Sequence, residues 1–470
     1  MRILGKDYKL MRVQEEALAR SKGKMGYGYF MEMGMGKTLT SQMDLLRNLE
    51  MGLTRRSLVV CPNSFKGGWV KDAEKHGLPI NQMVYVSGED RYVRSWMRRP
   101  SNQIRQLIVN YEALRSDNTM ALLNDYFDGH DVNTIFDESI QLKQFDSQQT
   151  KAGIRVGGMS SIVRLLSGKP TTQGPHDLWG QLRAARQLSG YNYYAFKNNY
   201  TRAGGFKGKQ VVGTKNEDQL RELLEPISFY ATKADWSDLP PKMYTQREYS
   251  MTPQMQAQFD SMYEEFVLWL NDEDYVAVDA AITKYIKLAQ IQAGFIIDDD
   301  GKVTELVEPK KNPRIRLMRQ IIDEEVTGKV LVPYHHKYVR EILTSAFADL
   351  NPAVLRGGMT VAEQDAEKDR FNNDPKCRIM FLQTRASKYG HTLLGDAANR
   401  CSTMIFFENT YSLDDRSQIE DRNHRWGQDA DHCLYVDLCG TVIDMRMTEA
   451  LAAKEDMFQR VFNPMRTRPT

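Results

Sequence analysis

Arg422 and Arg425 have the residue type and the spacing to act together on a phosphate. They lie three positions apart in the run of residues 418–428, so a helix would present both side chains on one face. Arginine stays protonated and offers planar donors to phosphate oxygens, as the charge that develops on a transferred γ-phosphate requires. The pair therefore predicts one half of a nucleoside triphosphate site.

A glycine-rich loop far upstream has the chemistry for the other half. Its residues are Gly34, Met35, Gly36, Lys37 and Thr38. Glycines let backbone N–H groups close around phosphates, the lysine supplies a point charge, and the threonine hydroxyl can bind Mg²⁺. The loop departs from the strict phosphate-loop pattern because Met31 stands in place of the first glycine. An ATP site made from two such distant segments implies two lobes that close on the nucleotide.

The acidic pair Asp137-Glu138 follows an apolar run and completes the chemistry of such a site. An aspartate at the end of a buried strand can hold Mg²⁺, and the neighbouring glutamate can orient the attacking water. An isolated pair of acids is more often a solvated turn. Together with the upstream loop and the downstream arginines, the pair favours catalysis with ATP and Mg²⁺ as ligands.

Composition sets broad limits on the function. The 470 residues include 63 Lys and Arg against 61 Asp and Glu, so a net charge of +2 neither requires nor excludes nucleic acid. Five scattered cysteines without a CxxC pair argue against a zinc site or a disulfide framework and favour a reduced compartment. No signal-peptide core or apolar run of about 18 residues is visible. We therefore expect a soluble, cytoplasmic protein with no membrane partner.

Short apolar runs, each followed by a polar or glycine-rich turn, recur in both halves of the chain and are typical of buried parallel strands. The runs are 57–61, 106–110, 134–137 and 163–167, then 329–332, 378–382, 403–407 and 434–438. They predict an α/β fold in two lobes, residues 1–240 and 241–470, with the functional residues after the carboxyl ends of the strands. Residues 252–296 are expected to form a helical protrusion, and residues 297–313 a charged, turn-rich linker.

The order of the motifs resembles that of the Swi/Snf-type ATPases of helicase superfamily 2. In the first half, the matching segments are 8–14, 32–38, 59–64 with Trp69, 110–112, 137–138 with Lys143 and Ser147, 166–170, and 177–179. In the second half, they are 232–242, 357–360, 371–372, 384–386 with Gly390, 418–428, and 440–442. The resemblance is collinear and covers most of the chain.

The resemblance implies two RecA-like lobes with parallel sheets flanked by helices, and a role for each matching residue. ATP binding would fall to Gln14, as the adenine contact, and to Gly34, Met35, Gly36, Lys37 and Thr38. Thr38 and Asp137 would hold Mg²⁺, and the implied catalytic residues are Lys37, Asp137, Glu138, Gln418, Arg422 and Arg425. DNA contacts are implied at Asn63, Ser64, Lys66, Lys143, Thr384 and Arg385.

Three positions depart from the family pattern. Ser139-Ile140 stands where relatives usually have a small residue followed by histidine, so the usual histidine link between hydrolysis and the third motif is absent. Lys169 replaces the customary threonine of that third motif, and Tyr411 replaces a common tryptophan. Because the phosphate loop, the acidic pair and both arginines are intact, we expect hydrolysis to survive with altered coupling.

The resemblance implies a double-stranded-DNA-stimulated ATPase that translocates and remodels or unwinds branched DNA. A compact motor resembles the small phage and bacterial members, which suggests replication, recombination or repair, in a bacterial or phage-infected cytoplasm. We expect a monomer that meets replication or recombination proteins. The alternatives are an RNA helicase, a restriction-system motor subunit, or a nucleotide-dependent DNA-binding scaffold that no longer hydrolyses ATP.

An aromatic-rich stretch, residues 191–197, has lysines nearby at Lys207 and Lys209. Such a stretch can be a base-stacking or duplex-wedging surface. More often it is part of a helix that faces a core, and the sequence alone leaves both interpretations open.

Overall fold

The computed structural model describes residues 1–188, 190–204, 210–236, 239–271, 278–298, 300–384 and 392–466. The chain forms two compact units. Unit 1 comprises Met1–Asp238 and Ala453–Thr470, and unit 2 comprises Leu239–Ala452. The sequence prediction assigned all residues after 241 to the second lobe, whereas residues 453–470 belong to unit 1. The reason is apolar burial, because Phe458, Val461 and Phe462 lie in the core of unit 1.

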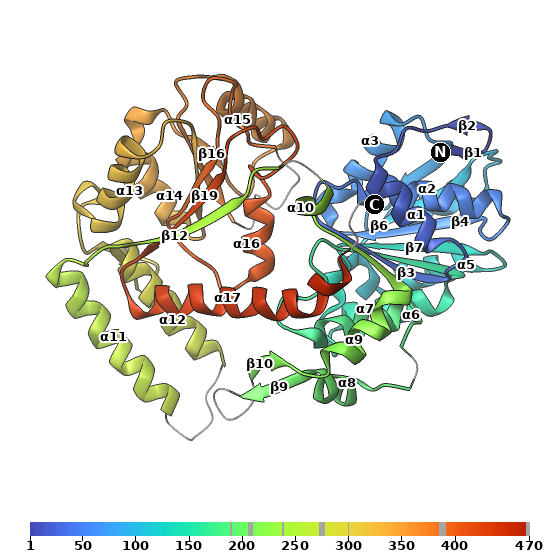
Figure 1. The fold of residues 1–470 in the computed structure, drawn as a ribbon, viewed down its shortest axis with the longest axis horizontal. Helices are drawn as coiled ribbons and strands as arrows, with labels where there is room; N and C mark the ends of the chain where they lie inside the picture. The colour runs from blue at the N-terminus through green and yellow to red at the C-terminus, as the bar shows by residue number, and fades with distance from the viewer. Residues whose placement is uncertain are drawn as a thin grey trace. The chain divides into compact units, whose positions relative to one another are not determined.

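Unit 1 is built on a seven-stranded sheet in which every pairing is parallel (Figure 1). In spatial order the strands are β11 (Ser228–Ala231), β3 (Gly26–Met31), β8 (Ile162–Leu166), β7 (Val132–Asp137), β4 (Arg56–Cys61), β6 (Ile104–Asn110) and β5 (Ile80–Val84). Two antiparallel hairpins accompany this sheet, β1 (Arg2–Ile3) with β2 (Lys6–Asp7), and β9 (Thr201–Gly204) with β10 (Gln210–Thr214).

Helices cover both faces of this sheet. One face carries α1 (Arg12–Ser21), α2 (Lys37–Glu50) and α3 (Lys66–Lys75). The other carries α4 (Asp90–Arg98), α5 (Asp117–Phe127), α6 (Gln148–Met159), α7 (Leu178–Ala184), α8 (Tyr193–Tyr200), α9 (Glu217–Leu224) and the end of α17 (Val442–Phe462). A short helix, α10 (Lys233–Trp236), follows β11.

Unit 2 is built on a six-stranded parallel sheet. Its strands in spatial order are β12 (Lys242–Glu248), β19 (Cys433–Cys439), β18 (Thr403–Phe406), β15 (Val330–Tyr334), β17 (Ile379–Gln383) and β16 (Ala353–Leu355). One face packs against α13 (Pro313–Glu324) and α14 (Lys337–Ala346), and the other against α15 (Val361–Asn373) and α16 (Leu413–Glu420). The predicted α/β fold in two lobes with flanked parallel sheets is confirmed.

The segment predicted as a helical protrusion, residues 252–296, contains two helices. They are α11 (Pro253–Asn271) and α12 (Val278–Ala293), which pack against each other. The base of α11 packs on the start of α17 through a cluster that includes Met255, Phe259 and Met447. The predicted linker, residues 297–313, begins at the end of β13 (Phe295–Ile297). It contains β14 (Val303–Glu305), which pairs with β13 in an antiparallel hairpin.

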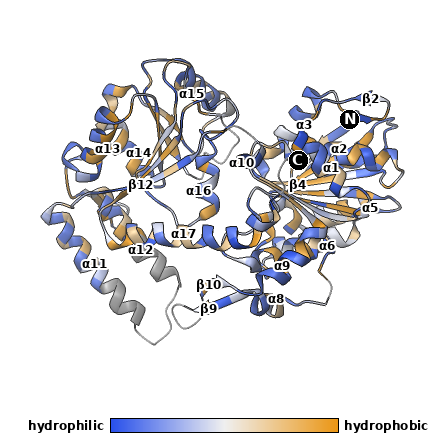
Figure 2. Ribbon diagram, viewed as in Figure 1, coloured by the Kyte–Doolittle hydropathy of each residue, from blue (hydrophilic) through white to orange (hydrophobic). Residues whose placement is uncertain are grey.

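Burial on both faces explains why the strands are apolar without alternation. In β4, Val59 faces the cluster that contains Trp69 of α3, whereas Leu58 and Val60 face the cluster that contains Leu178 of α7. Figure 2 shows the same arrangement, with hydrophobic strands inside hydrophilic outer helix surfaces. None of the described helices is both long and apolar enough to cross a membrane.

A buried ionic network fixes the helix that follows the glycine-rich loop. Asp44 of α2 accepts a hydrogen bond from Arg164 Nε of β8 at 2.6 Å, and its carboxylate is also paired with Arg47. Arg47 Nη2 donates to Ser21 Oγ at 3.0 Å, and Tyr29 OH donates to the same oxygen at 2.6 Å. The network therefore ties α2 to β8, α1 and β3 with charges that are almost fully excluded from water.

We predict that Asp44→Ala destabilises unit 1 by about 3–5 kcal/mol, because it leaves the Arg164 guanidinium buried without its carboxylate. Urea denaturation followed by circular dichroism measures the loss. The matched control is Glu16→Ala, which removes an exposed ion pair with Arg20 and should cost less than about 1 kcal/mol. Equal shifts of the two midpoints would contradict the structural role of Asp44.

Candidate nucleotide site

The glycine-rich loop connects the end of β3 to the start of α2. Gly34 and Gly36 have φ angles of +88° and +76°, which side chains other than glycine rarely adopt. A Cβ at Gly36 would also lie 2.3 Å from Gln14 Nε2, so space and backbone both demand glycine there. Lys37 is the first residue of α2, whose N-terminus therefore points its free N–H groups into the loop.

Two predicted ligand residues brace the loop from within. Lys37 is 9% exposed, and its Nζ donates to Met31 O at 2.9 Å and to Glu32 O at 3.4 Å. Gln14 Nε2 donates to Gly36 O at 3.1 Å, while its Oε1 accepts from Met11 N at 2.8 Å. Gln14, predicted as an adenine contact, thus holds the loop in this structure.

The remaining predicted loop residues have different surroundings. Met35 is buried in the core beside β3, and Gly34 is exposed. Thr38, the predicted Mg²⁺ ligand, is half-buried in the first turn of α2. The outer rim of the loop is anchored separately, since Glu32 Oε2 accepts from Lys233 N at 2.8 Å.

The acidic pair lies at the carboxyl end of β7. Asp137 is 6% exposed and accepts from Trp69 Nε1 at 2.9 Å and from Glu138 N at 3.1 Å. Burial raises the pKa of Asp137, while the Trp69 hydrogen bond and the charge of Lys37 lower it. Glu138 is also buried and adopts a left-handed φ of +50°, an uncommon conformation for glutamate.

These residues fit a magnesium ion. A carboxylate whose burial disfavours its charged form is stabilised by a nearby cation, and hydroxyl and carboxylate oxygens are the ligands Mg²⁺ prefers. Asp137 and Thr38 would hold the ion. It would neutralise charge on the phosphates during hydrolysis.

Sheet order brings three motifs to one edge. β8 lies between β3 and β7, and Leu166 of β8 is in register with both Tyr29 and Asp137. The loop after β8 therefore follows directly beside the phosphate loop. A Cβ at Gly168 would lie 3.5 Å from Met33 N and 3.8 Å from Lys37 Nζ, which places the third motif against the phosphate loop.

The third motif is linked to the acidic pair by a buried glutamine. Ser139, which replaces the small residue before the family's histidine, donates from Oγ to Gln181 Oε1 at 2.8 Å. Gln181 Nε2 in turn donates to Pro170 O at 2.7 Å and to Asp177 O at 2.9 Å. A continuous hydrogen-bonded path therefore runs from the residue after Glu138 to the residue after Lys169, without a histidine.

Lys169 has a partner in the last segment of the chain. Its Nζ forms an ion pair with Glu455 of α17 and lies 5.5 Å from the centre of the Phe458 ring. The customary threonine at this position is too short to reach either group. Lys169 thus joins the third motif, residues 166–170, to the part of α17 that belongs to unit 1.

Arg422 and Arg425 belong to segment 418–428, here called the sixth motif, which lies in unit 2. The helix expected to carry them ends before them. α16 ends at Glu420, and residues 421–427 form successive turns that contain Gly427 at φ +93°. The prediction that a helix presents Arg422 and Arg425 on one face is therefore wrong. Arg422 is fully buried and donates from Nε to Gln418 O at 2.9 Å, while Arg425 is half-buried.

The sixth motif is held by the start of unit 2. Glu420 accepts from Lys242 Nζ at 3.0 Å, from Tyr244 OH at 2.8 Å and from Arg416 Nε at 2.7 Å. The ring Nε2 of His424 lies 2.8 Å from Pro240 O. Pro240 and Lys242 belong to the matching segment 232–242, so the end of that segment positions the turns that carry the arginines. Gln418 Nε2 donates to Asp414 Oδ1 at 2.9 Å.

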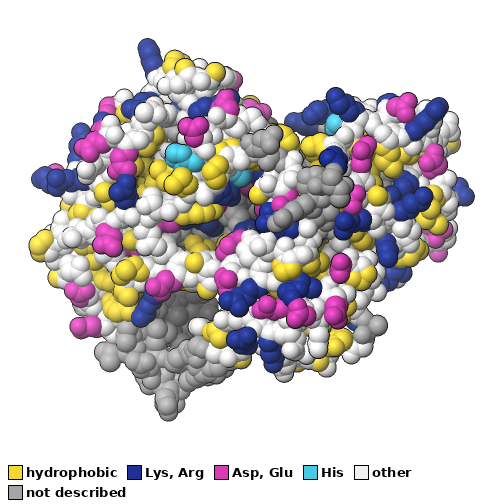
Figure 3. All heavy atoms as spheres, in the orientation of Figure 1, with side chains coloured by type: hydrophobic (Ala, Val, Ile, Leu, Met, Phe, Trp, Pro, Cys, Tyr) yellow, Lys and Arg dark blue, Asp and Glu magenta, His cyan; other side chains and the backbone are white. Residues whose placement is uncertain are grey.

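The predicted DNA contacts differ in exposure. Asn63 and Ser64 are exposed and precede α3, and Lys143 is half-buried and donates to Thr172 Oγ1 at 3.3 Å. Lys66 is 9% exposed and its Nζ donates to Tyr85 O at 2.9 Å, and Thr384 is buried with its Oγ1 donating to Tyr334 O at 3.1 Å. Arg385 lies outside the described residues. In Figure 3, cationic side chains are interspersed with acidic ones over the face drawn.

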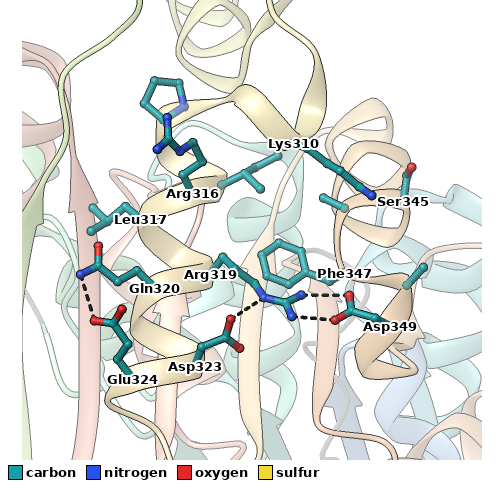
Figure 4. Close-up of a pocket in the computed structure, with 14 residues that line it drawn as sticks. Lys310, Arg316, Leu317, Arg319, Gln320, Asp323, Glu324, Ser345, Phe347 and Asp349 are labelled. Carbon is teal, nitrogen blue, oxygen red and sulfur yellow. Dashed lines mark hydrogen bonds and ion pairs between the residues drawn. The ribbon is translucent and has the colours of Figure 1, made fainter.

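A separate pocket lies in unit 2 and involves none of the sequence motifs described above. It has a volume of about 1020 Å³ and lies between α13 and residues 345–349 (Figure 4). Arg319 points into it, but its guanidinium donates to both oxygens of Asp349, at 2.9 and 2.6 Å, and to Asp323 at 2.7 Å. The Arg319 guanidinium is therefore already bound by two carboxylates. None of the predicted ligand residues lines the pocket.

Sequence reasoning missed several residues that position the site. Trp69 was matched together with segment 59–64 and given no role, yet its indole supports Asp137. Gln181 and Asp44 were not singled out, since their partners are distant in the sequence. The i,i+3 spacing of Asp44 and Arg47 is the signal that could have identified an ion pair on this helix.

Comparisons with known proteins agree with the motif order. The family described as the SNF2-related domain matches residues 22–294, more than half of the chain. Protein p41 of Acyrthosiphon pisum secondary endosymbiont phage 1 is 27% identical over 416 residues, which cover 83% of each chain. A SWI/SNF-related matrix-associated actin-dependent regulator of chromatin subfamily A-like protein 1 homolog from Caenorhabditis elegans is 25% identical over 408 residues, covering 84% of this chain and 54% of that protein.

The chain thus spans about half the length of this nematode relative. Among solved structures, the Sulfolobus solfataricus SWI2/SNF2 ATPase core in complex with dsDNA is 18% identical and covers 99% of this chain and 95% of that chain. Its TM-score of 0.44 is too low to transfer a DNA-bound geometry to this protein.

The ion pairs of Glu420 predict a pH-dependent stability of unit 2. Burial alone would raise the pKa of Glu420, but Lys242 and Arg416 lower it from 4.5 to about 2. Because the folded pKa is below the unfolded one, this stability is fully present above about pH 4.5 and is lost as the pH falls towards 2, an effect worth about 3 kcal/mol. Glu408, whose pKa is also about 2, acts in the same range.

Urea denaturation at pH 7 and pH 3.5 tests this assignment with wild type and Glu420→Gln. We expect the variant to have a lower free energy of unfolding than wild type at pH 7. At pH 3.5 the difference in free energy of unfolding should be smaller, because wild type loses part of the Glu420 stabilisation whereas glutamine does not titrate. An unchanged difference between the two pH values would show that Glu420 is not the group responsible.

Proposed function

This chain belongs to the SNF2-related domain family, whose members hydrolyse ATP, and from that premise we propose that it is a DNA-stimulated ATPase that translocates on double-stranded DNA. The observation that carries the proposal is the convergence of three motifs at one sheet edge of unit 1. The phosphate loop, the Asp137-Glu138 pair and Gly168 follow β3, β7 and β8, which are adjacent strands. Such an edge is where parallel α/β sheets bind their ligands.

Each residue at this edge has a chemical role in the proposal. Lys37 and the backbone N–H groups around Gly36 would bind the β- and γ-phosphates, and Lys37 would exchange its present carbonyl partners for phosphate oxygens. Thr38 and Asp137 would hold Mg²⁺. Glu138 would orient the water for in-line attack, as its position next to Asp137 allows.

We assign to Arg422 and Arg425 the neutralisation of charge on the transferred phosphate, with Gln418 beside them. Such arginines are typically worth about 10³ to 10⁵ in rate. Because they belong to a different unit from Lys37, this role requires the two units to meet during the cycle. A cycle of meeting and separating, with DNA bound to both, is how hydrolysis would become translocation.

DNA binding would rest on phosphate contacts and therefore carry little sequence specificity and strong salt dependence. Asn63 and Ser64 are the proposed contacts whose exposure supports this role most directly, and Lys143 is half-buried. The relative from C. elegans is named as a regulator of chromatin, and a phage protein matches along most of its length. We propose branched DNA as the substrate, in replication, recombination or repair.

One departure bears on a second candidate, a DNA-binding scaffold without hydrolysis. The missing histidine after the acidic pair would favour it, because that residue usually links hydrolysis to the third motif. The path from Ser139 through Gln181 to Pro170 provides a substitute link. We therefore favour an active ATPase over the scaffold.

The first test is phosphate release measured without polymer and with duplex DNA, branched DNA, single-stranded DNA or RNA. We expect DNA duplexes to stimulate hydrolysis, and Lys37→Ala to abolish it, since the variant loses the charge that binds the phosphates. Lys24→Ala changes an exposed lysine of unit 1 and should behave as wild type. Stimulation by RNA alone would indicate an RNA helicase, and no hydrolysis under any condition would favour the scaffold.

Arg425→Ala tests the arginine role separately. We expect kcat to fall by about 10³, with the affinity for ATP changed only a few-fold, because the side chain would act on the transition state. Arg247→Ala, which removes an exposed ion pair with Glu325 in unit 2, is the matched control. Unchanged turnover would refute the assignment, and an equal loss of ATP binding would indicate a structural role.

A further inference from the structure

Unit 1 carries an aromatic cluster that no step of the proposed ATP hydrolysis uses. It consists of Phe145, Trp179, Tyr193 and Tyr194. The rings of Phe145 and Tyr193 are stacked, with centroids 3.8 Å apart and planes inclined by 7°. Trp179 meets both rings edge-on, with centroids 6.4 Å from Phe145 and 5.8 Å from Tyr193.

Core packing does not account for the outer part of the cluster. Phe196 and Tyr200 of α8 are buried in the core of unit 1 and supply the apolar face of this helix. Tyr194 is 64% exposed, yet its ring is held by edge contacts to Phe145 and Tyr193, with centroids 5.6 and 5.5 Å away. An exposed ring fixed in orientation is prepared to stack on a flat partner at little entropic cost.

Lys197 lies beside this ring, and further cations belong to the segments that carry the other rings of the cluster. Lys197 follows Tyr194 by three residues on α8, so the two side chains are neighbours on the helix surface. Lys143 precedes Phe145 by two residues, and the Arg183 guanidinium lies 6.0 Å from the Trp179 ring. The α8 helix also packs beside the hairpin β9–β10, which begins where α8 ends (Figure 1).

Both lysines also influence His176. Burial lowers the pKa of this imidazole, Asp177 raises it, and the charges of Lys197 and Lys143 lower it. The carboxylate of Asp177 is buried and accepts backbone N–H bonds from Thr172 and Gln173 at 2.7 and 2.8 Å. The surface next to the aromatic rings therefore presents Lys197 and Lys143 together with the exposed carboxylate of Asp146, while the buried acid Asp177 is satisfied internally.

We propose that the aromatic cluster binds unpaired bases of a DNA strand, with a base stacked on Tyr194 and phosphates bound by Lys197 and Lys143. Flat rings combined with cations are the chemistry that binds single strands without sequence preference. Bases inside a duplex are stacked on each other and cannot reach such a ring. The inference rests on the proposed DNA-directed function and specifies its substrate, since it favours forks and tailed duplexes over plain duplex.

Fluorescence anisotropy tests the proposal with a labelled duplex that carries a single-stranded thymidine tail, the same duplex without a tail, and the same duplex with an abasic tail. We expect wild type to prefer the thymidine tail, and Tyr194→Ala to bind it about 10-fold more weakly. Tyr194→Trp should keep the preference, because the indole also stacks. Lys197→Ala should weaken binding of the thymidine and abasic tails alike and reduce the salt dependence.

Tyr92→Ala is the matched control, because Tyr92 is 70% exposed on α4, away from the cluster. Thermal unfolding shows whether each variant is folded. An unchanged tail affinity in folded Tyr194→Ala would overturn the proposal, as would an equal loss on the abasic tail. If no DNA stimulates phosphate release by wild type, the proposed function is wrong. Anisotropy on the tailed duplex then still decides whether Tyr194 binds unpaired bases.

Discussion

The buried contact between Asp44 and Arg164 is the constraint on which the nucleotide site depends. The two charges are excluded from water, so each is tolerated only while the other is in place. Their pairing fixes α2 against β8, and α2 begins at Lys37 while β8 ends at the third motif. The two ends of the glycine-rich loop are therefore held by this ion pair, through α2, and by β3 of the sheet.

The sequence was informative where a strand is buried on both faces. Runs such as 57–61 and 434–438 are mostly apolar because helices cover both sides of β4 and β19, and they were identified from the sequence. Edge strands escaped notice for the converse reason. β12 alternates between half-buried and exposed residues, and β5 contains Asn81 and Gln82, so neither shows an apolar run. Pairing with a neighbour, and not hydropathy, makes them strands.

At the site, the sequence identified which residues take part but did not reveal the contacts that these residues make. Motif order named Lys37, Asp137 and Glu138, which the structure brings to one sheet edge. It did not reveal that Lys66 is bound to a carbonyl of Tyr85, because burial of a lysine depends on a partner 19 positions away. The Ser139–Gln181 bond joins residues 42 positions apart and could not be read from local spacing.

The path of the chain has a consequence for biosynthesis. Unit 2 is inserted between two parts of unit 1, because the polypeptide leaves unit 1 after Asp238 and returns at Ala453. The returning segment contributes Phe458 and Phe462, whose rings pack on Tyr230 beside the sheet, and Arg466, which pairs with Asp235. During synthesis on the ribosome, the hydrophobic core of the first 238 residues therefore stays incomplete until the end of α17 emerges. The assembly of the ATP-binding half is thereby tied to the synthesis of the other half.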